Sequence, residues 1–178
     1  MAYRLVGYIL RAIKILERRI IARPAREVLD KQVDDHGELI ADLVKHPEVQ
    51  YTKNVKHHEF HSRFDHMMLA SKFAYYFANK IGADVKVCVR AAAIHDVWGK
   101  GMYCQPSVDF AKKIGESQGV QDAIETHMVL KKAPRTKEQW VVAWADECAW
   151  GVESLEYLRL SLKSFLGWVA EISPANIK

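Results

Sequence analysis

The stretch AAAIHDVWGKG, residues 91–101, places two ionisable side chains at the end of an apolar run. Its first four letters are small or apolar, and His95 and Asp96 follow without a break in the pattern. The pattern predicts a buried helix over 84–97 with Asp84 as its N-cap. Because a buried carboxylate is costly unless it is paired, the doublet needs a partner close by.

Two further polar residues interrupt apolar helical faces in the same way. His66 shares its face with Ala70 and Phe73, and Asp146 follows the apolar run WVVAWA. Taken singly, His66 can be a core histidine bonded to a carbonyl group, and Asp146 can pair with an arginine such as Arg90. Taken with the doublet, two imidazoles and two carboxylates on three helices favour a shared divalent metal ion.

The remaining pattern is also helical, and no alternation typical of strands is present. Residues 47–61, which begin at Pro47, are expected to form a loop or a broken helix. The helices that we predict, in addition to 84–97, span about 3–21, 26–45, 62–80, 106–116, 120–131, 136–153 and 154–170. The chain is therefore expected to be all-α: a single helical bundle over 46–178, with N-terminal helices in 1–45 that pack on it or extend it.

Length and composition favour one globular domain. The chain has 178 residues, of which 49% are hydrophobic and 27% charged, which is ordinary for a folded soluble protein. Cys88, Cys104 and Cys148 have no paired spacing, so we expect a reducing compartment rather than disulfides or a structural zinc site. No run of apolar residues is long enough to span a membrane, and a cytoplasmic location is the simplest expectation.

The net charge of +4 is concentrated in the N-terminal segment. Basic residues at helical spacing leave an apolar face over 3–21, so this segment is predicted to be an amphipathic basic helix. We expect it to pack on the domain, although peripheral contact with a membrane surface or an acidic partner is an alternative. The rest of the chain is slightly acidic, which argues against nucleic acid as a partner.

The order of these residues resembles the HD superfamily of metal-dependent phosphohydrolases. The segment RFDHMMLASKFAYYFANKIG (63–82) resembles the helix of the family's first histidine, and RAAAIHDVWGKG (90–101) resembles the doublet that names it. The resemblance is particularly close to a group of small bacterial HD proteins, most of them uncharacterised. Their pattern is matched by HH at 57–58, THM at 126–128, PRTKE at 134–138 and VVAWADECA at 141–149.

The resemblance implies an HD-domain fold and hydrolysis of a nucleotide or other small phosphate ester by a metal-activated water. It implies one divalent ion (Mn, Fe, Zn, Ni or Mg) held by His66, His95, Asp96 and Asp146. Two residues are candidates for catalysis, His127 and Lys100. The candidates for binding the substrate are Arg63, His57, His58 and Arg135. The oligomeric state is not indicated.

The chain departs from the family pattern at two points. Two-metal relatives carry a further histidine where this chain has Gln105, and glutamine is a poor ligand for a transition metal. Relatives with one metal carry an acid shortly after the doublet, whereas this chain has Val97 and Trp98, so His127 or Glu147 is expected to take that role.

Three alternatives to this expectation remain open. The first is an HD module that binds a nucleotide or a partner protein without turnover. The second is an iron oxygenase on the same scaffold, which needs two irons and is disfavoured by Gln105. The third is a separate metal site formed by His57 and His61, four residues apart.

Overall fold

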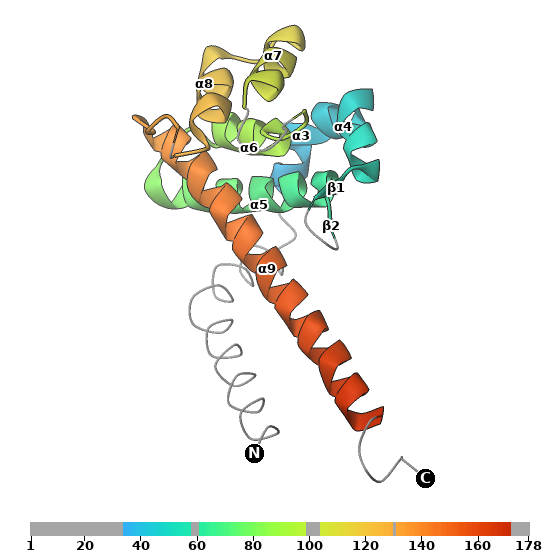
Figure 1. The fold of residues 1–178 in the computed structure, drawn as a ribbon. Helices are drawn as coiled ribbons and strands as arrows, with labels where there is room; N and C mark the ends of the chain where they lie inside the picture. Colours follow the sequence, from blue (N-terminus) through green and yellow to red (C-terminus); the bar gives the residue numbers. More distant parts are fainter. Residues whose placement is uncertain (1–33, 58–60, 99–103, 130, 172–178) are drawn as a thin grey trace.

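The structure is a computed structural model, and it describes residues 34–57, 61–98, 104–129 and 131–171 (Figure 1). The predicted helix over 3–21 lies outside these ranges, as do the first residues of the predicted helix over 26–45. Two of the candidate site residues, His58 and Lys100, also lie outside them.

The described part of the chain is almost entirely helical, and the predicted all-α fold is confirmed. Two very short strands form the only sheet in these ranges. The elements in chain order are α3 (Asp34–Lys45), α4 (Pro47–Tyr51), the 3₁₀ helix η2 (Thr52–Asn54), β1 (Lys56–His57), β2 (His61–Ser62), α5 (Arg63–Ile81), α6 (Val85–Ile94), α7 (Gln105–Lys113), α8 (Gln118–Thr126) and α9 (Lys137–Glu171).

Helix α6 is the centre of the packing. It contacts α3, α5, α8 and α9, and its last four residues, Ala91–Ile94, are completely buried. This last part of the helix is apolar on all sides and must be covered on all sides, and three successive alanines allow its neighbours to approach closely. The end of α6 therefore delivers the His95–Asp96 doublet into the interior of the bundle.

The ends of α5 and α6 follow from local capping. Ser62 and Asp65 form a reciprocal capping box at the start of α5, and Gly82 ends this helix in the left-handed conformation at φ 65°. Asp84 accepts a hydrogen bond from the backbone of Val87, as predicted for an N-cap. Helix α6 ends at Ile94 rather than at residue 97, so the doublet lies just beyond the last helical residue.

Helix α9 corrects the prediction of two helices over 136–153 and 154–170. It runs unbroken for 35 residues and crosses the bundle against α5, and its C-terminal half extends away from the other helices that the structure describes (Figure 1). A single glycine, Gly151, costs a helix about 1 kcal/mol relative to alanine and does not end it. No helix in the described ranges is both long enough and apolar enough to cross a membrane.

The segment expected to be a loop or broken helix contains α4, η2 and a small hairpin. Pro47 occupies the first turn of α4, where its missing N–H group costs nothing. In the hairpin, Lys56 pairs with Ser62 and His57 pairs with His61 in an antiparallel register. Strands of two residues are too short for alternation to reveal them, so sequence patterns could not predict this hairpin.

Candidate metal centre

Three of the predicted ligands converge on one point between α5, α6 and α9. The Nε2 atom of His66 lies 2.9 Å from Oδ1 of Asp146, and Nε2 of His95 lies 3.3 Å from the same oxygen. The three donor atoms lie within 4.8 Å of one another, which makes them one of the groups able to hold a metal ion. His66 lies on α5, Asp146 lies on α9 and His95 directly follows α6, so the packing of the bundle assembles the group.

The other nitrogen of each imidazole ring, Nδ1, also has a hydrogen-bond partner. The Nδ1 atom of His66 lies 3.1 Å from each carboxylate oxygen of Glu153, and Nδ1 of His95 lies 2.8 Å from the carbonyl oxygen of Ala92. These acceptors favour a proton on Nδ1 of each ring. The Nε2 lone pairs of the neutral rings are then available to a metal ion, as is usual for ligating histidines.

Burial and the neighbouring charges shift the pKa values of His66 and Asp146 in opposite directions. Burial lowers the pKa of His66, but the hydrogen bonds with Asp146 and Glu153 outweigh burial and raise its pKa to about 9. For Asp146, burial raises the pKa, yet the neighbouring His95 and His66 outweigh it and hold the pKa well below its usual range. Without a metal ion, a proton on His66 supplies the positive charge that Asp146 and Glu153 require.

His127 extends the histidine cluster toward α8. Its ring meets the ring of His95 edge-on at a centroid distance of 4.9 Å, and its Nδ1 lies 2.6 Å from the carbonyl oxygen of Ile124. Burial and the nearby His95 lower the pKa of His127 to about 4, so the ring is neutral at pH 7. A neutral ring that donates through Nδ1 leaves Nε2 as a proton acceptor or ligand.

Asp96, the second member of the doublet, has other partners in this structure. Its Oδ2 atom lies 3.2 Å from Nε of Arg63 and 3.6 Å from Nδ1 of His57. Neither metal-capable group found among the described residues includes Asp96. The carboxylate nevertheless lines the same cavity as His66, His95 and Asp146.

A cavity of about 380 Å³ opens over this cluster. Its volume suits a small phosphate ester. Its lining is mostly titratable: His57, His66, His95, Asp96, His127, Met128, Asp146, Glu147 and Trp150.

Other candidate residues lie away from the cavity or outside the described ranges. Arg135 is exposed, and its backbone N–H donates a hydrogen bond to the side-chain oxygen of Gln139. Gln105 is also exposed and donates to Asp109 within α7, so it takes no part in lining the cavity. The structure gives no description of Lys100 or His58.

The simpler explanation for Asp146, a pairing with Arg90, is wrong. Arg90 binds the carboxylates of Asp42 and Glu116 and the carbonyl oxygen of Leu39 instead. This network joins α3 and α6 to the loop before α8, and Arg90 lies five residues before His95.

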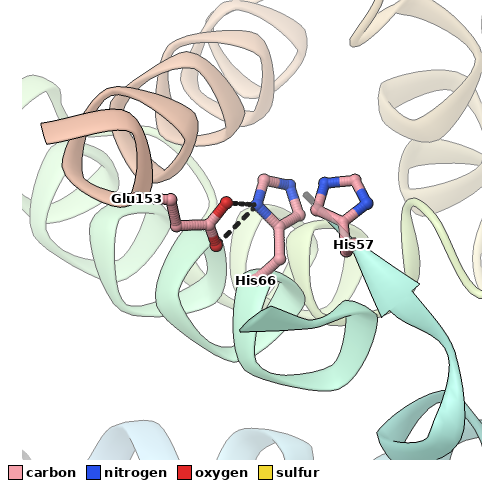
Figure 2. A group of neighbouring side chains, drawn as sticks. All are labelled: His57, His66 and Glu153. Atoms are coloured by element: carbon pink, nitrogen blue, oxygen red, sulfur yellow. Dashed lines mark hydrogen bonds and ion pairs between the residues drawn. The ribbon is translucent and has the colours of Figure 1, made fainter. Parts of the chain in front are cut away.

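The structure adds Glu153, which our sequence reasoning missed. Figure 2 shows its carboxylate directed at His66, on the side opposite to His57. A sequence signal existed, because Glu153 follows Asp146 by seven residues, or two turns of one helix, and so shares its face. The predicted helix over 136–153 contains both residues, so the signal was present in the prediction and was not used.

Glu153, His66 and His57 form a second group whose atoms could hold a metal ion (Figure 2). The rings of His57 and His66 lie 4.2 Å apart between centroids. Both metal-capable groups use His66, and one neutral imidazole offers a single lone pair. The two groups are therefore alternatives for an ion.

His61 was predicted from its spacing to form a metal site with His57. It belongs to neither metal-capable group, and its Nε2 instead lies 3.4 Å from Oε2 of Glu156.

Comparison with known proteins agrees with this arrangement. The model of the HD domain family matches residues 63–151, which is half of the chain and includes His66, His95, Asp96 and Asp146. The chain therefore belongs to the HD domain family, a superfamily of metal-dependent phosphohydrolases. No curated protein and no solved structure matches the chain. The likeness to small bacterial HD proteins stays a prediction.

Proposed function

We propose that this protein is a metal-dependent phosphohydrolase that acts on a nucleotide or another small phosphate ester. The observation that carries the proposal is the convergence of two imidazole Nε2 atoms, from His66 and His95, on one carboxylate oxygen of Asp146. This convergence lies at a cavity of suitable volume in a chain of the HD family.

The donor set fits one divalent ion. Two neutral imidazole nitrogens with a carboxylate oxygen are a usual set for zinc, manganese or iron, with positions left for water and a phosphate oxygen. We assign His66, His95 and Asp146 as ligands, and Asp96 as the fourth by its place in the doublet. When bound, such an ion acts as a Lewis acid on the phosphoryl group and lowers the pKa of a coordinated water.

Cationic and N–H groups beside the cavity suit the phosphate. His57 lines the cavity, and Arg63 forms an ion pair with Asp96, another lining residue, so both can donate to phosphate oxygens that enter it. Lys100 follows the doublet closely in sequence and stays a candidate for the same task. Arg135 is a weaker assignment because, unlike Arg63, it has no ion pair with a cavity-lining residue among the described residues.

Hydrolysis also requires a proton acceptor and donor. Water attacks phosphorus, the ester P–O bond breaks, and the leaving alcohol takes up a proton. We assign proton transfer to His127 or Glu147, which both line the cavity. His127 is held through Nδ1 by the carbonyl oxygen of Ile124, so its Nε2 is available to exchange a proton.

A binding module without turnover is the second candidate. The observation that favours it concerns Val97 and Trp98, which directly follow the doublet at the place where relatives carry an acid. Val97 is buried in the core, and the backbone N–H of Trp98 lies 3.3 Å from the hydroxyl of Ser107. Neither supplies a carboxylate to the cavity.

A panel of phosphate esters separates the two candidates. The protein, loaded with Mn²⁺, is expected to release phosphate or an alcohol from at least one nucleotide or sugar phosphate. The double variant His95→Ala/Asp96→Ala is expected to lose this activity. Tight nucleotide binding without any turnover would favour the binding module, and hydrolysis that survives in the double variant would contradict the phosphohydrolase.

A further inference from the structure

The side chain of Glu153 is almost fully withdrawn from water. Only 3% of it is exposed, although it carries an acidic group, and it lies two helical turns beyond Asp146 on α9. Ionised carboxylates are buried at a high cost unless hydrogen bonds or opposite charges compensate them. The compensation visible here is His66, whose Nδ1 lies 3.1 Å from both carboxylate oxygens.

Two roles are compatible with this contact. Glu153 could be a direct ligand of an ion held with His57 and His66, or it could orient His66 toward an ion on the other side of the ring. The second role is favoured, because Nε2 of His66 already converges with His95 on Asp146. An ion at Nε2 and another at Nδ1 would require an imidazole without any proton, which is rare at neutral pH.

We propose that Glu153 is a positioning residue of the metal centre. Its carboxylate accepts the Nδ1–H hydrogen bond of His66, which fixes the orientation of the ring and presents the Nε2 lone pair to the ion. This inference rests on the proposed metal site. It also extends the site beyond the family match, which ends at residue 151.

The geometry of α9 explains how one helix supplies both a metal ligand and the residue that orients His66. Asp146 and Glu153 are two turns apart, roughly 10 Å along the axis at a rise of 1.5 Å per residue. His66 contacts each carboxylate through a different ring nitrogen: Nδ1 faces Glu153 (Figure 2), and Nε2 lies 2.9 Å from Oδ1 of Asp146. A continuous helix holds this spacing constant, so the ring is clamped between one ligand and one orienting group.

The first test measures the affinity for Zn²⁺ by competition with a chelator of known affinity. Glu153→Gln keeps the size of the side chain and removes its charge, and it is expected to weaken Zn²⁺ binding about 10- to 100-fold, the usual effect of losing such a partner. The matched control is Glu156→Gln, the same change on the same helix. Glu156 is 55% exposed and contacts His61 rather than His66, so this variant is expected to bind Zn²⁺ like the wild type.

The second test is spectroscopic. In zinc-loaded protein with ¹⁵N-labelled histidine, the NMR spectrum is expected to show His66 with a slowly exchanging proton on Nδ1 and zinc on Nε2. A Glu153 side chain that only stabilised the fold would not determine which nitrogen of His66 carries the proton and which binds zinc. In Glu153→Gln the resonance of that proton is expected to move upfield, because a neutral acceptor replaces a charged one.

The outcomes separate this inference from the proposed function. If the wild type does not bind Zn²⁺, the metal site and the inference fall together. If the wild type binds and Glu153→Gln binds equally well, the inference is overturned while the metal site stands. Zinc on Nδ1 of His66, with the proton on Nε2, would also overturn it and assign Glu153 and His57 as ligands.

Discussion

His66 on α5 and Asp146 on α9 are separated by 80 positions in the chain and lie 2.9 Å apart, measured from Nε2 to Oδ1. The contact joins two helices that pack against each other, and Nε2 of His95, directly after α6, lies 3.3 Å from the same oxygen. A change at any of these three residues therefore affects both the packing of the bundle centre and the proposed metal centre.

Asp146→Asn is expected to abolish stoichiometric metal binding. The substitution keeps the shape of the side chain but replaces an anionic ligand with an amide, which divalent transition ions bind poorly. Metal content measured after loading with Mn²⁺ and gel filtration should fall from one ion per chain to almost none. Asp109→Asn, the same change at an exposed position of α7, should retain the ion. Equal metal content in both variants would contradict the assignment of Asp146.

Trp150 provides a test of the nucleotide class of substrate. Its indole is half-exposed and lines the cavity. Stacking of a base on an aromatic side chain is worth about 1–3 kcal/mol, so Trp150→Ala should raise KM for nucleoside monophosphates at least about fivefold. KM for ribose 5-phosphate should not change. Trp144→Ala, on the same helix but not part of the lining, is the control. A uniform effect on both substrates would argue against base stacking.

Arg90 is expected to be a main contributor to the stability of the fold. Its guanidinium pairs with Glu116, which is 7% exposed, and with Asp42, which is 63% exposed. Arg90→Met leaves a buried carboxylate without its partner and should lower the free energy of unfolding by about 3–5 kcal/mol. Asp42→Asn removes only the exposed partner and should cost less than about 1 kcal/mol. Urea denaturation measures both, and equal losses would be inconsistent with this division.

His36 is expected to make the fold sensitive to mild acid. Burial and the nearby Lys72 lower the pKa of His36 to about 4, and its Nε2 lies 3.0 Å from the hydroxyl of Ser71. Above pH 6.5 the ring is neutral in both states. As the pH falls from 6.5 to 4, only the unfolded chain takes up the proton, so the folded state loses stability, by up to about 3 kcal/mol. Below pH 4 this loss is complete.

The measurement is urea denaturation between pH 7 and pH 4. His36→Gln can keep a hydrogen bond to Ser71 but does not titrate, so its stability should decline less steeply across this range than that of the wild type. The same slope in both proteins would show that another group is responsible.

Much of the fold and the centre of the site could be predicted from the sequence. Gly82 and Asp84 have local signals that mark helix ends, and these signals act within a few residues of the chain. His66 and Asp146 could be identified because each interrupts an apolar face, where a polar group requires a partner. The structure brings them together with His95.

The remaining features depend on contacts that no local pattern encodes. Glu153 was missed although the predicted helix over 136–153 contains it together with Asp146, because a glutamate at a helix end is ordinarily exposed to solvent. The partners of Asp96 could not be anticipated, since His57 approaches from a hairpin too short to be predicted. Arg90 offered a simple explanation for Asp146 until the structure showed its own carboxylate partners.

The central claim is that one divalent ion binds among His66, His95 and Asp146. Anomalous diffraction from crystals of the zinc-loaded protein, collected on both sides of the zinc absorption edge, tests it most directly. We predict a single strong peak at coordination distance, about 2.0–2.2 Å, from both Nε2 atoms and from a carboxylate oxygen of Asp146. A peak bound instead by His57, Nδ1 of His66 and Glu153, or the absence of any peak at this cavity, would contradict the claim.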